Sequence, residues 1–400
     1  MTDTAGSARG LRVAVVGGGI GGLAAACSLR RRGIDVSVFE QAAALGEIGA
    51  GLTVFPNSLR QMERMGLGDA LSAAGAKISI GSCICRSDGT VVAPMETTDS
   101  SGWNGIYGMH RADLLTVLAA DLPPDTVRTN YRCLGFEQNE TAARLHFANG
   151  ETVEADVVIA ADGIHSVLQK YVVAPKPPEY SGVRAYRGLV PRSALPDWPD
   201  AVHLVWMGDG KHFMVYPVRG GQLLNYVGFV PTTTETAESW SAVGDRDELA
   251  ASFAGWNPHI TSVLEKVESC FWWGLYDRRP LDTWTNGRLV LLGDAAQAML
   301  PHLGQGANQS IEDGVALAVL LAGQDASGVP GLLPQFETFR RVRTDAIQAE
   351  ARKNGLRYDS KYESLEQRDR EVKDARIFRR SLFDYDVEQA ALAHWNQPLT

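Results

Sequence analysis

A glycine-rich turn near the start of the chain constrains its fold more than any other feature. It stands between a β-branched apolar stretch, residues 12–16, and a helical pattern, residues 23–32. The glycines that meet the spacing G-x-G-x-x-G are Gly17, Gly19 and Gly22. They permit a tight turn and let the backbone approach a pyrophosphate at the positive end of the helix. A second strand pattern ends in Glu40, about 20 residues further on, where an acid can accept hydrogen bonds from a ribose. Together these features predict a βαβ unit that binds a dinucleotide, whereas the glycines alone would indicate only a tight turn.

Two later turns place an acid next to a small residue behind a buried strand. Asp162-Gly163 follows a nearly continuous apolar run, residues 153–161, and Gly293-Asp294 follows a shorter run, residues 288–292. Open α/β sheets bind ligands at the carboxyl ends of their strands, so both acids are candidate ligand contacts. The alternative is that each Asp only caps a helix.

The remaining sequence changes character twice. Residues 178–275 alternate between apolar and polar positions and are separated by Gly-rich turns, which predicts an antiparallel sheet. From residue 335 onward the chain is charged and mainly helical. We therefore expect an α/β fold with a Rossmann-like nucleotide-binding domain, an inserted and mainly antiparallel β-sheet substrate domain, and a helical C-terminal region. The expected boundaries are 1–75, 106–177 and 276–334 for the nucleotide-binding domain, 76–105 and 178–275 for the sheet domain, and 335–400 for the helical region.

Composition excludes several classes of protein. The chain has 400 residues and a net charge of -9, which argues against a nucleic-acid surface because such a surface needs clustered Lys and Arg. It has no run of the ~20 apolar residues that a membrane-spanning helix requires, and its start does not resemble a signal peptide. The five cysteines show neither a disulfide framework nor metal-like spacing, so we expect free thiols and no metal. We expect a cytoplasmic enzyme that binds neither membrane nor nucleic acid and is a monomer or a homodimer.

The three motifs, in this order and spacing, resemble those of the FAD-dependent aromatic hydroxylases of the para-hydroxybenzoate hydroxylase type. The resemblance covers residues 11–345. Four further segments are similar to the branch that contains salicylate hydroxylase and 3-hydroxybenzoate 6-hydroxylase, namely residues 46–51, 110–114, 185–188 and 300–308.

This resemblance implies that FAD is the cofactor and that NADH or NADPH binds transiently as cosubstrate. Glu40 would bind the adenosine ribose, Arg111 would contact FAD, and Asp294 would hold its ribityl-pyrophosphate portion. Asp162 belongs to a motif linked to both FAD and NAD(P)H, and residues 304–308 would lie against the isoalloxazine ring. The expected cofactor-binding residues are Gly17, Gly19, Ile20, Gly22, Glu40, Gln41, Arg111, Asp162, Asp294, Pro301, Gly304, Gly306, Ala307 and Asn308.

The chemistry implied by the family is ring hydroxylation through a flavin C4a-hydroperoxide formed with O2. A base that takes the proton from a substrate hydroxyl would make the ring more electron-rich. His212, with Tyr216 on the same strand face by the two-residue period, is the candidate catalytic group. The alternative is an ordinary strand His and Tyr. The expected substrate contacts are Tyr186, His212, Tyr216, Pro301 and His302, although His302 alternatively only faces its loop.

Three positions depart from the family pattern. Gln297 replaces a common His, Gln169 replaces a common Arg, and Thr53 stands where hydroxynicotinate hydroxylases have a substrate-binding His. We expect the substrate to be a small aromatic acid or phenol, and a salicylate-like compound is the first candidate. The alternatives are a tailoring hydroxylase or epoxidase acting on a larger polycyclic or heteroaromatic substrate, an FAD oxidoreductase that inserts no oxygen, and a protein that keeps FAD only structurally.

Overall fold

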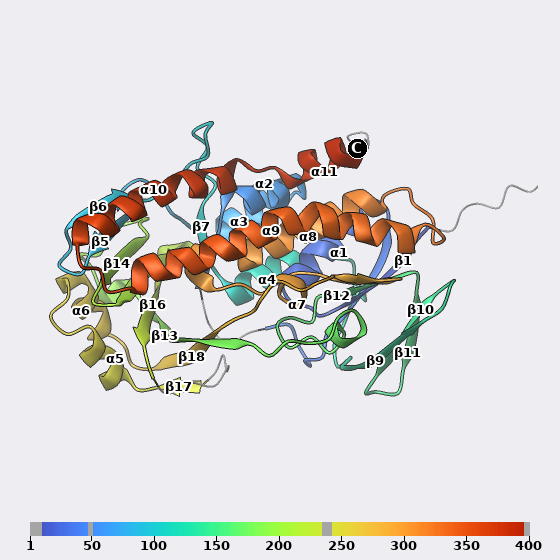
Figure 1. Ribbon diagram of the computed structural model, residues 1–400, viewed down its shortest axis with the longest axis horizontal. Helices are drawn as coiled ribbons and strands as arrows, with labels where there is room; N and C mark the ends of the chain where they lie inside the picture. The colour runs from blue at the N-terminus through green and yellow to red at the C-terminus, as the bar shows by residue number, and fades with distance from the viewer. Residues whose placement is uncertain (1–9, 47–50, 234–241, 396–400) are drawn as a thin grey trace, which may run out of the picture.

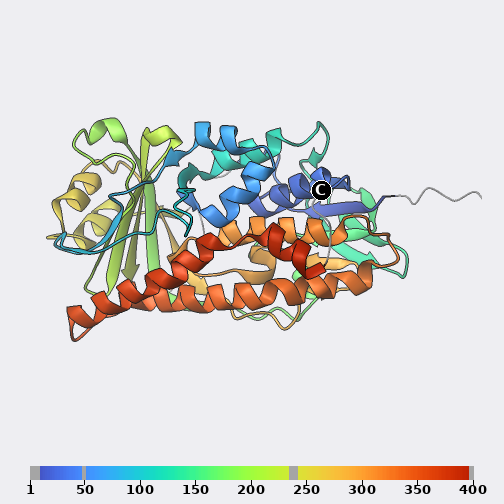
Figure 2. The same cartoon turned by 90° about the horizontal axis from the view of Figure 1, so that it is seen from above.

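The computed structural model describes residues 10–46, 51–233 and 242–395. Most of the segment 46–51, one of those that carry the family resemblance, lies outside the described residues. The molecule is elongated, with a parallel sheet toward one end, an antiparallel sheet toward the other, and long C-terminal helices beside both (Figures 1 and 2). This arrangement is the predicted fold class.

The parallel sheet has the strand order β19-β20-β12-β1-β2-β8, and its strands are parallel except for the pair β19-β20. The bounds are β1 Arg12–Val16, β2 Asp35–Phe39, β8 Val127–Arg128, β12 Val157–Ala160, β19 Thr285–Asn286 and β20 Leu289–Leu291. Because the central strands are buried on both faces, they consist of near-continuous apolar runs.

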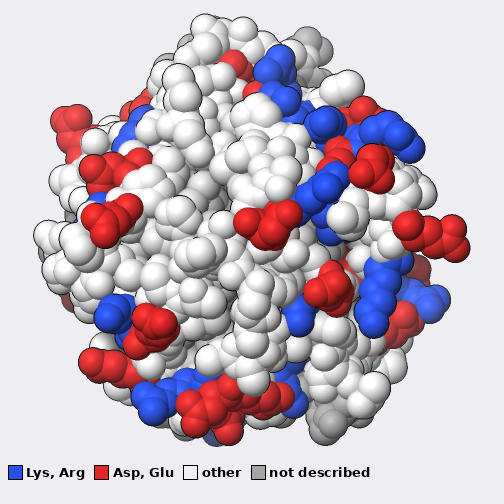
Figure 3. Space-filling view, turned by 90° about the vertical axis from the view of Figure 1, so that its left-hand side faces the viewer, with Lys and Arg blue, Asp and Glu red and all other residues white. Residues whose placement is uncertain are grey.

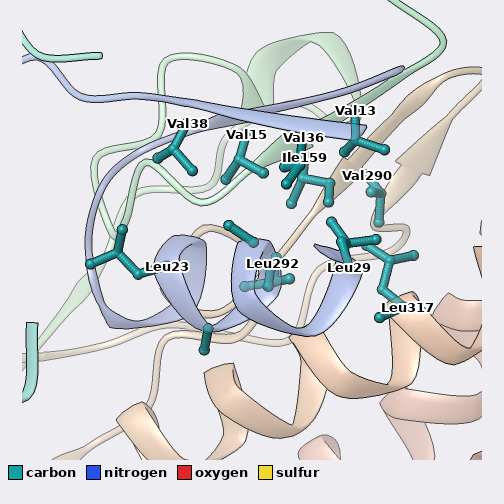
Figure 4. Packing of buried hydrophobic residues seen from close by; sticks show 14 of the residues in the cluster. Val13, Val15, Leu23, Leu29, Val36, Val38, Ile159, Val290, Leu292 and Leu317 are labelled. Carbon is teal, nitrogen blue, oxygen red and sulfur yellow. The ribbon is translucent and has the colours of Figure 1, made fainter. Parts of the chain in front are cut away.

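Helices α1 (Ile20–Arg31) and α8 (Gly306–Leu321) pack together against this sheet. Figure 4 shows Leu23 and Leu29 of α1 directed toward strand residues that include Val15. Gly314 permits this close approach, since a Cβ on it would lie 2.8 Å from the Cα of Ala25. The tight packing holds α8 directly alongside α1.

The antiparallel sheet has the strand order β17-β18-β13-β16-β15-β14-β5-β6, and only β14 and β5 are parallel neighbours. The bounds are β5 Cys83–Arg86, β6 Val91–Pro94, β13 Glu179–Pro191, β14 Leu204–Gly208, β15 Lys211–Val218, β16 Leu223–Pro231, β17 Ala242–Gly244 and β18 Cys270–Asp277. One face packs on helices α5 (Arg246–Ser252) and α6 (Pro258–Leu264) through a core that includes Phe213 and Phe253. The opposite face is left to contact the rest of the molecule.

Smaller elements complete the fold of the described residues, among them two three-stranded sheets. These are β3 Gly51–Val54, α2 Pro56–Arg64, α3 Gly68–Ala74, β4 Ala76–Lys77, β7 Tyr107–His110, α4 Arg111–Ala120, β9 Cys133–Gln138, β10 Ala143–Phe147, β11 Thr152–Ala155, α7 Asp294–Gln297 and the 3-10 helices η1 Gln169–Tyr171, η2 Arg192–Ala194, η3 Arg219–Gly221 and η4 Pro301–Leu303. Strand β5 pairs with β14 although about 120 residues separate them in sequence, and β6 pairs with β5 at the edge of the sheet. The exact domain boundaries stay a prediction.

The C-terminal region consists of α9 (Val329–Asp359), α10 (Leu365–Asp384) and α11 (Val387–Trp395). Arg340 of α9 fixes it to α8 through fully buried ion pairs with Glu312, at 2.9 Å, and Asp313, at 2.7 Å. Among the described residues, no helix has both the length and the apolar stretch needed to cross a membrane. On the face drawn in Figure 3, positive and negative side chains lie beside one another around a large uncharged area.

Candidate active site

The glycine turn after β1 is shaped by close backbone contacts. A Cβ on Gly17, whose φ is +111°, would lie 2.3 Å from the carbonyl oxygen of Ala161, and a Cβ on Gly22 would lie 2.0 Å from the carbonyl oxygen of Gly17. Gly19 differs, because no atom of the described residues other than its own chain neighbours lies within 4 Å of the Cβ position there. Gly19 is also the N-cap of α1, and no side chain caps that helix end. The first N–H groups of α1 therefore adjoin a space that suits a pyrophosphate.

Glu40 lies at the end of β2 beside this turn, as the sequence predicted. Its two carboxylate oxygens accept hydrogen bonds from the N–H groups of Gly18 and Ala42, both at 2.7 Å. Each oxygen keeps a second acceptor position, so a ribose hydroxyl can bind as well. Gln41 is exposed next to it and Ile20 is buried at the start of α1. The roles of these residues toward the cofactor stay predictions.

Asp162 follows β12 and organises its own loop. One carboxylate oxygen accepts hydrogen bonds from the N–H groups of Val167, at 2.8 Å, and Leu168, at 3.4 Å. The other oxygen is buried and has no hydrogen-bond partner among the described residues. Burial raises the pKa of Asp162. A donor group of a bound cofactor would satisfy this oxygen, so the loop fits a polar ligand.

The two glutamines that depart from the family pattern have structural roles here. Gln297 donates a hydrogen bond to Asp313 at 2.6 Å, and Gln169 donates one to the carbonyl oxygen of Ala295 at 3.0 Å. Both hold α7, whose first residue is Asp294.

The loop between η4 and α8 is held by Asn308. Its side-chain amide donates to the carbonyl oxygens of Thr53, at 3.0 Å, and Gly304, at 2.8 Å, and its oxygen accepts from the N–H of Phe55 at 2.9 Å. Gly304 adopts a φ of +65°, in the left-handed region that favours glycine. The N-terminus of α8 begins at Gly306, and its dipole favours negative charge nearby.

A cavity of about 260 Å³ lies where these loops meet the antiparallel sheet. Strand registry explains which side chains reach it: Met214 pairs with Val227 and Tyr216 pairs with Asn225, so the alternate residues of β15 and β16 share one face. The sheet residues on the cavity wall are Arg187, His203, Val205, Met214, Tyr216, Asn225, Val227, Phe229, Trp273, Gly274, Leu275 and Tyr276.

Many of the residues singled out from the sequence are brought together here. Those that line the cavity are Arg111, Tyr216, Asp294, Pro301, His302, Gly304, Gly306 and Ala307. The Tyr216 ring lies 4.9 Å from that of His203, and burial raises the pKa of Tyr216 although Arg187 opposes the shift. The amide nitrogen of Asn225 is buried without a hydrogen-bond partner among the described residues.

Two expected substrate contacts do not reach the cavity. Tyr186 lies on the opposite face of β13, in the core beneath α5 and α6, and Arg184 donates a hydrogen bond to its hydroxyl at 3.0 Å. Adjacent strand residues point to opposite faces, so Arg187 lines the cavity instead. His212 is fully buried behind the wall, where its ring stacks on that of Phe229 at 4.0 Å. Neither Tyr186 nor His212 is therefore placed to contact a ligand in this cavity directly.

Four residues near the cavity were missed from the sequence. Arg187 lies over the ring of Trp273 at 4.8 Å and is 7% exposed, and its signal was its place in the segment 185–188 that resembles the family. His203, which directly precedes β14, and Arg379 of α10 also line the wall, and no local motif marks them. Asp359 bonds to His212 from 147 residues away. His212, His302 and Asp359 offer ligand atoms within 4.8 Å of one another, which by residue type could hold a divalent cation.

Comparison with known proteins agrees with this geometry. The family described as FAD binding domain matches residues 10–351. The chain is 38% identical to 3-amino-4-hydroxybenzoate 2-monooxygenase of Streptomyces cremeus, covering 86% of this chain and 87% of the relative. It is 34% identical to a salicylate hydroxylase of Pseudomonas putida, covering 88% and 86%. A solved salicylate hydroxylase substrate complex superposes with a TM-score of 0.84 at 30% identity over 98% of this chain and 99% of that one. The chain belongs to the FAD-dependent aromatic hydroxylases with this FAD binding domain, and it is an FAD-dependent monooxygenase.

Proposed function

We propose that this enzyme uses NADH or NADPH and O2 to hydroxylate a single-ring aromatic acid that already carries a ring hydroxyl. The observation that carries the proposal is the cavity of about 260 Å³, whose wall combines aromatic rings with Arg187 and Arg379. Such a wall offers a flat apolar site together with positive charge.

The cavity wall suits an aromatic ring. Phe229 and Trp273 present aromatic surfaces, and Met214 and Val227 add apolar contacts from the neighbouring strands. A substrate ring would bury its apolar surface here, which contributes roughly 25 cal/mol per Å².

The charges on the wall favour an acid. Arg187 is almost completely buried, and a guanidinium in a low-dielectric site attracts a carboxylate much more strongly than one in water. Since the chain carries a net charge of -9, such local positive charge is what would hold an anion. The names of two relatives, 3-amino-4-hydroxybenzoate 2-monooxygenase and salicylate hydroxylase, likewise describe enzymes of hydroxylated aromatic acids.

Cavity size weighs against the rival with a polycyclic substrate. Part of the cavity would be filled by FAD, because Arg111, Asp294 and Ala307 line it and would hold the cofactor. The space left for a substrate is smaller than the whole cavity, which favours one ring with short substituents over a fused system.

When bound, reduced FAD supplies the activation of O2 that puts one oxygen atom on the ring. The residues that would hold FAD are those of the glycine turn, Arg111, Asp162, Asp294 and the loop 304–308. Around the ring, the N-terminus of α8 would stabilise negative charge, and the apolar walls would exclude water.

The experiment is oxidation of NADH and of NADPH by the FAD-loaded enzyme across matched aromatic compounds, with product mass determined. Salicylate and 3-amino-4-hydroxybenzoate should stimulate oxidation. Benzoate, which lacks the hydroxyl, and phenol, which lacks the carboxylate, should stimulate it much less. The product should be heavier by one oxygen atom, or by one oxygen atom minus carbon dioxide if decarboxylation accompanies hydroxylation. Failure of every aromatic acid to stimulate oxidation would refute the proposal.

A further inference from the structure

Helix α10 contributes a positive charge to the cavity wall. Arg379 of α10 lines the cavity, as does His203, which directly precedes β14. Figure 1 shows α10 lying along the edge strands β5 and β6, and α10 contacts β6. Arg379 stands beyond residue 351, where the match to the FAD binding domain ends, so family membership assigns it no role.

A buried acid fixes the rotation of α10. Glu96 is 7% exposed and accepts hydrogen bonds from Arg376, at 2.9 Å, and from Arg380, at 2.8 Å. These two arginines are four residues apart, so they lie on one face of the helix and pair with the same acid. Arg379 projects about 100° around the helix from Arg380. It therefore reaches the cavity while its two neighbours stay on Glu96.

Arg379 has no counter-ion within the part of the chain that the structure describes. It is half-buried and makes no hydrogen bond or ion pair there. The Nε2 atom of His203 is likewise buried without a hydrogen-bond partner among the described residues. Burial, and then the charge of Arg379, lowers the pKa of His203 to about 3, so its ring is neutral. The two side chains together offer one positive charge and several N–H donors to an acceptor in the cavity.

The charges around the cavity are unbalanced. Three arginines line it, namely Arg111, Arg187 and Arg379, whereas Asp294 is the one carboxylate among the described lining residues. Arg111 and Asp294 belong to the residues that would hold FAD. Arg187 and Arg379 are then left for the substrate, and each can attract an anionic group in this poorly solvated site.

These two arginines act from opposite ends of the sheet wall. Across the sheet, Arg187 pairs with Val227, and Val227 pairs with Met214. Met214 in turn pairs with Val205 of β14, so Arg187 lies three strand spacings from Val205, about 14 Å at the backbone. His203 precedes Val205 by two residues and shares its face of the sheet. A single benzene ring with an acidic group at each end can bridge such a gap through one charge-assisted hydrogen bond of about 2.8 Å at either end.

We propose that Arg379 and His203 form a second anion subsite, and that the substrate is a hydroxylated benzoate with a second carboxylate para to the first. This inference rests on the proposed function, in which the buried Arg187 attracts the first carboxylate. Arg379 pairs with the second carboxylate, and the Nε2–H of His203 donates a hydrogen bond to it. Met214 and Val227 pack against the ring between the two ends.

The test compares ligands that differ only in the place of the second charge. Binding to the FAD-loaded enzyme is followed by the change in flavin absorbance, which needs no turnover. 2-Hydroxyterephthalate is salicylate with a second carboxylate para to the first, and 3-hydroxyphthalate is its isomer with adjacent carboxylates and the same net charge. The wild type should bind 2-hydroxyterephthalate roughly tenfold or more tightly than salicylate, as a charge-assisted hydrogen bond predicts. It should bind 3-hydroxyphthalate no more tightly than salicylate.

Variants then assign the effect to α10. Arg379→Met should weaken binding of 2-hydroxyterephthalate roughly 10- to 100-fold and change binding of salicylate less than about threefold, whereas Arg379→Lys should keep part of the preference. His203→Leu, which removes a donor without changing the charge, should weaken binding of 2-hydroxyterephthalate by a smaller factor. Arg370→Met is the matched control and should leave both affinities unchanged. Arg370 is exposed on α10, and nine residues, or two and a half turns, place it on the opposite side of the helix from Arg379.

Two results would overturn the second subsite and leave the proposed function standing, provided that salicylate still stimulates NADH or NADPH oxidation. One is equal binding of salicylate and 2-hydroxyterephthalate by the wild type, which decides the question even if Arg379→Met does not fold. The other is an equal loss of affinity for both compounds in Arg379→Met. Failure of all three acids to bind and to stimulate oxidation would overturn the proposed function as well.

Discussion

Replacing Arg340 by Met should destabilise the protein by about 3 kcal/mol, because it removes the cation from a fully buried charge cluster. The Arg340 guanidinium donates to Asp313 at 2.7 Å, to Glu312 at 2.9 Å and to Gln309 at 2.8 Å. Methionine keeps much of the apolar volume of the side chain. The loss of unfolding free energy is therefore due to removal of the charge and not to a cavity.

The magnitude follows from what each acid retains. Breaking a buried ion pair commonly costs about 3–5 kcal/mol. Glu312 keeps Arg343 at 2.8 Å, and although burial would raise the pKa of Glu312, Arg343 and Arg340 outweigh it and lower this pKa to about 2. Burial raises the pKa of Asp313 even with Arg340 present, so Asp313 can take up a proton when the cation is removed. Both effects limit the loss to the lower part of the range.

The assay is urea unfolding of the FAD-saturated protein at fixed FAD concentration, since bound ligand adds to apparent stability. Arg341→Met is the matched control, because the neighbouring Arg341 is 28% exposed and pairs with Glu337 near the surface. It should change the free energy of unfolding by less than about 1 kcal/mol. Equal losses in the two variants would refute the assignment of a charge cluster that holds α9 on α8.

Three more outcomes follow from the site. Gly22→Ala should prevent correct folding around the glycine turn, because its Cβ would meet the carbonyl oxygen of Gly17. Gly19→Ala should leave the stability of the FAD-free protein unchanged but weaken FAD binding, measured by flavin fluorescence. Equal stability of the two variants would contradict this. Arg187→Met should raise KM for an aromatic acid roughly 10- to 100-fold, as loss of a charge-assisted hydrogen bond predicts, while leaving KM for a neutral phenol unchanged; a parallel rise for both compounds would count against a carboxylate contact. Burial lowers the pKa of His203 from 6.5 to about 3, so the unfolded chain binds a proton that the folded chain does not, and the stability supplied by neutral His203 is lost as pH falls below 6.5. His203→Gln should therefore flatten the decline in unfolding free energy between pH 6 and pH 5 by about 1.4 kcal/mol, and an unchanged slope would be inconsistent with a buried neutral histidine.

The nucleotide-binding part was predictable because its signals are local. The spacing of the glycine turn, and acids that directly follow buried strands, depend on a few consecutive residues and on the geometry of one strand and one helix. Gly17 and Gly22 are required by backbone contacts, which a sequence pattern reflects directly. The two-residue period likewise predicted that residues 212 and 216 share a face.

The substrate end was predictable only in part, because it depends on registry between distant strands. Arg187 and not Tyr186 lines the cavity because Arg187 pairs with Val227 across the strands, and no local pattern predicts this pairing. His212 lies on the predicted face but stands one step too far along β15 to reach the cavity. Asp359 is even less accessible to prediction, because a residue at the end of a 31-residue helix meets β15 only through the packing of that helix.

The most direct test of this account is turnover of a hydroxylated aromatic acid under isotope-labelled O2, with the label in the product measured by mass spectrometry. We expect one labelled oxygen atom on the ring for each NADH or NADPH consumed in coupled turnover. A product without label, or oxidation of NADH or NADPH that yields only hydrogen peroxide for every aromatic acid, would contradict the proposed ring hydroxylation.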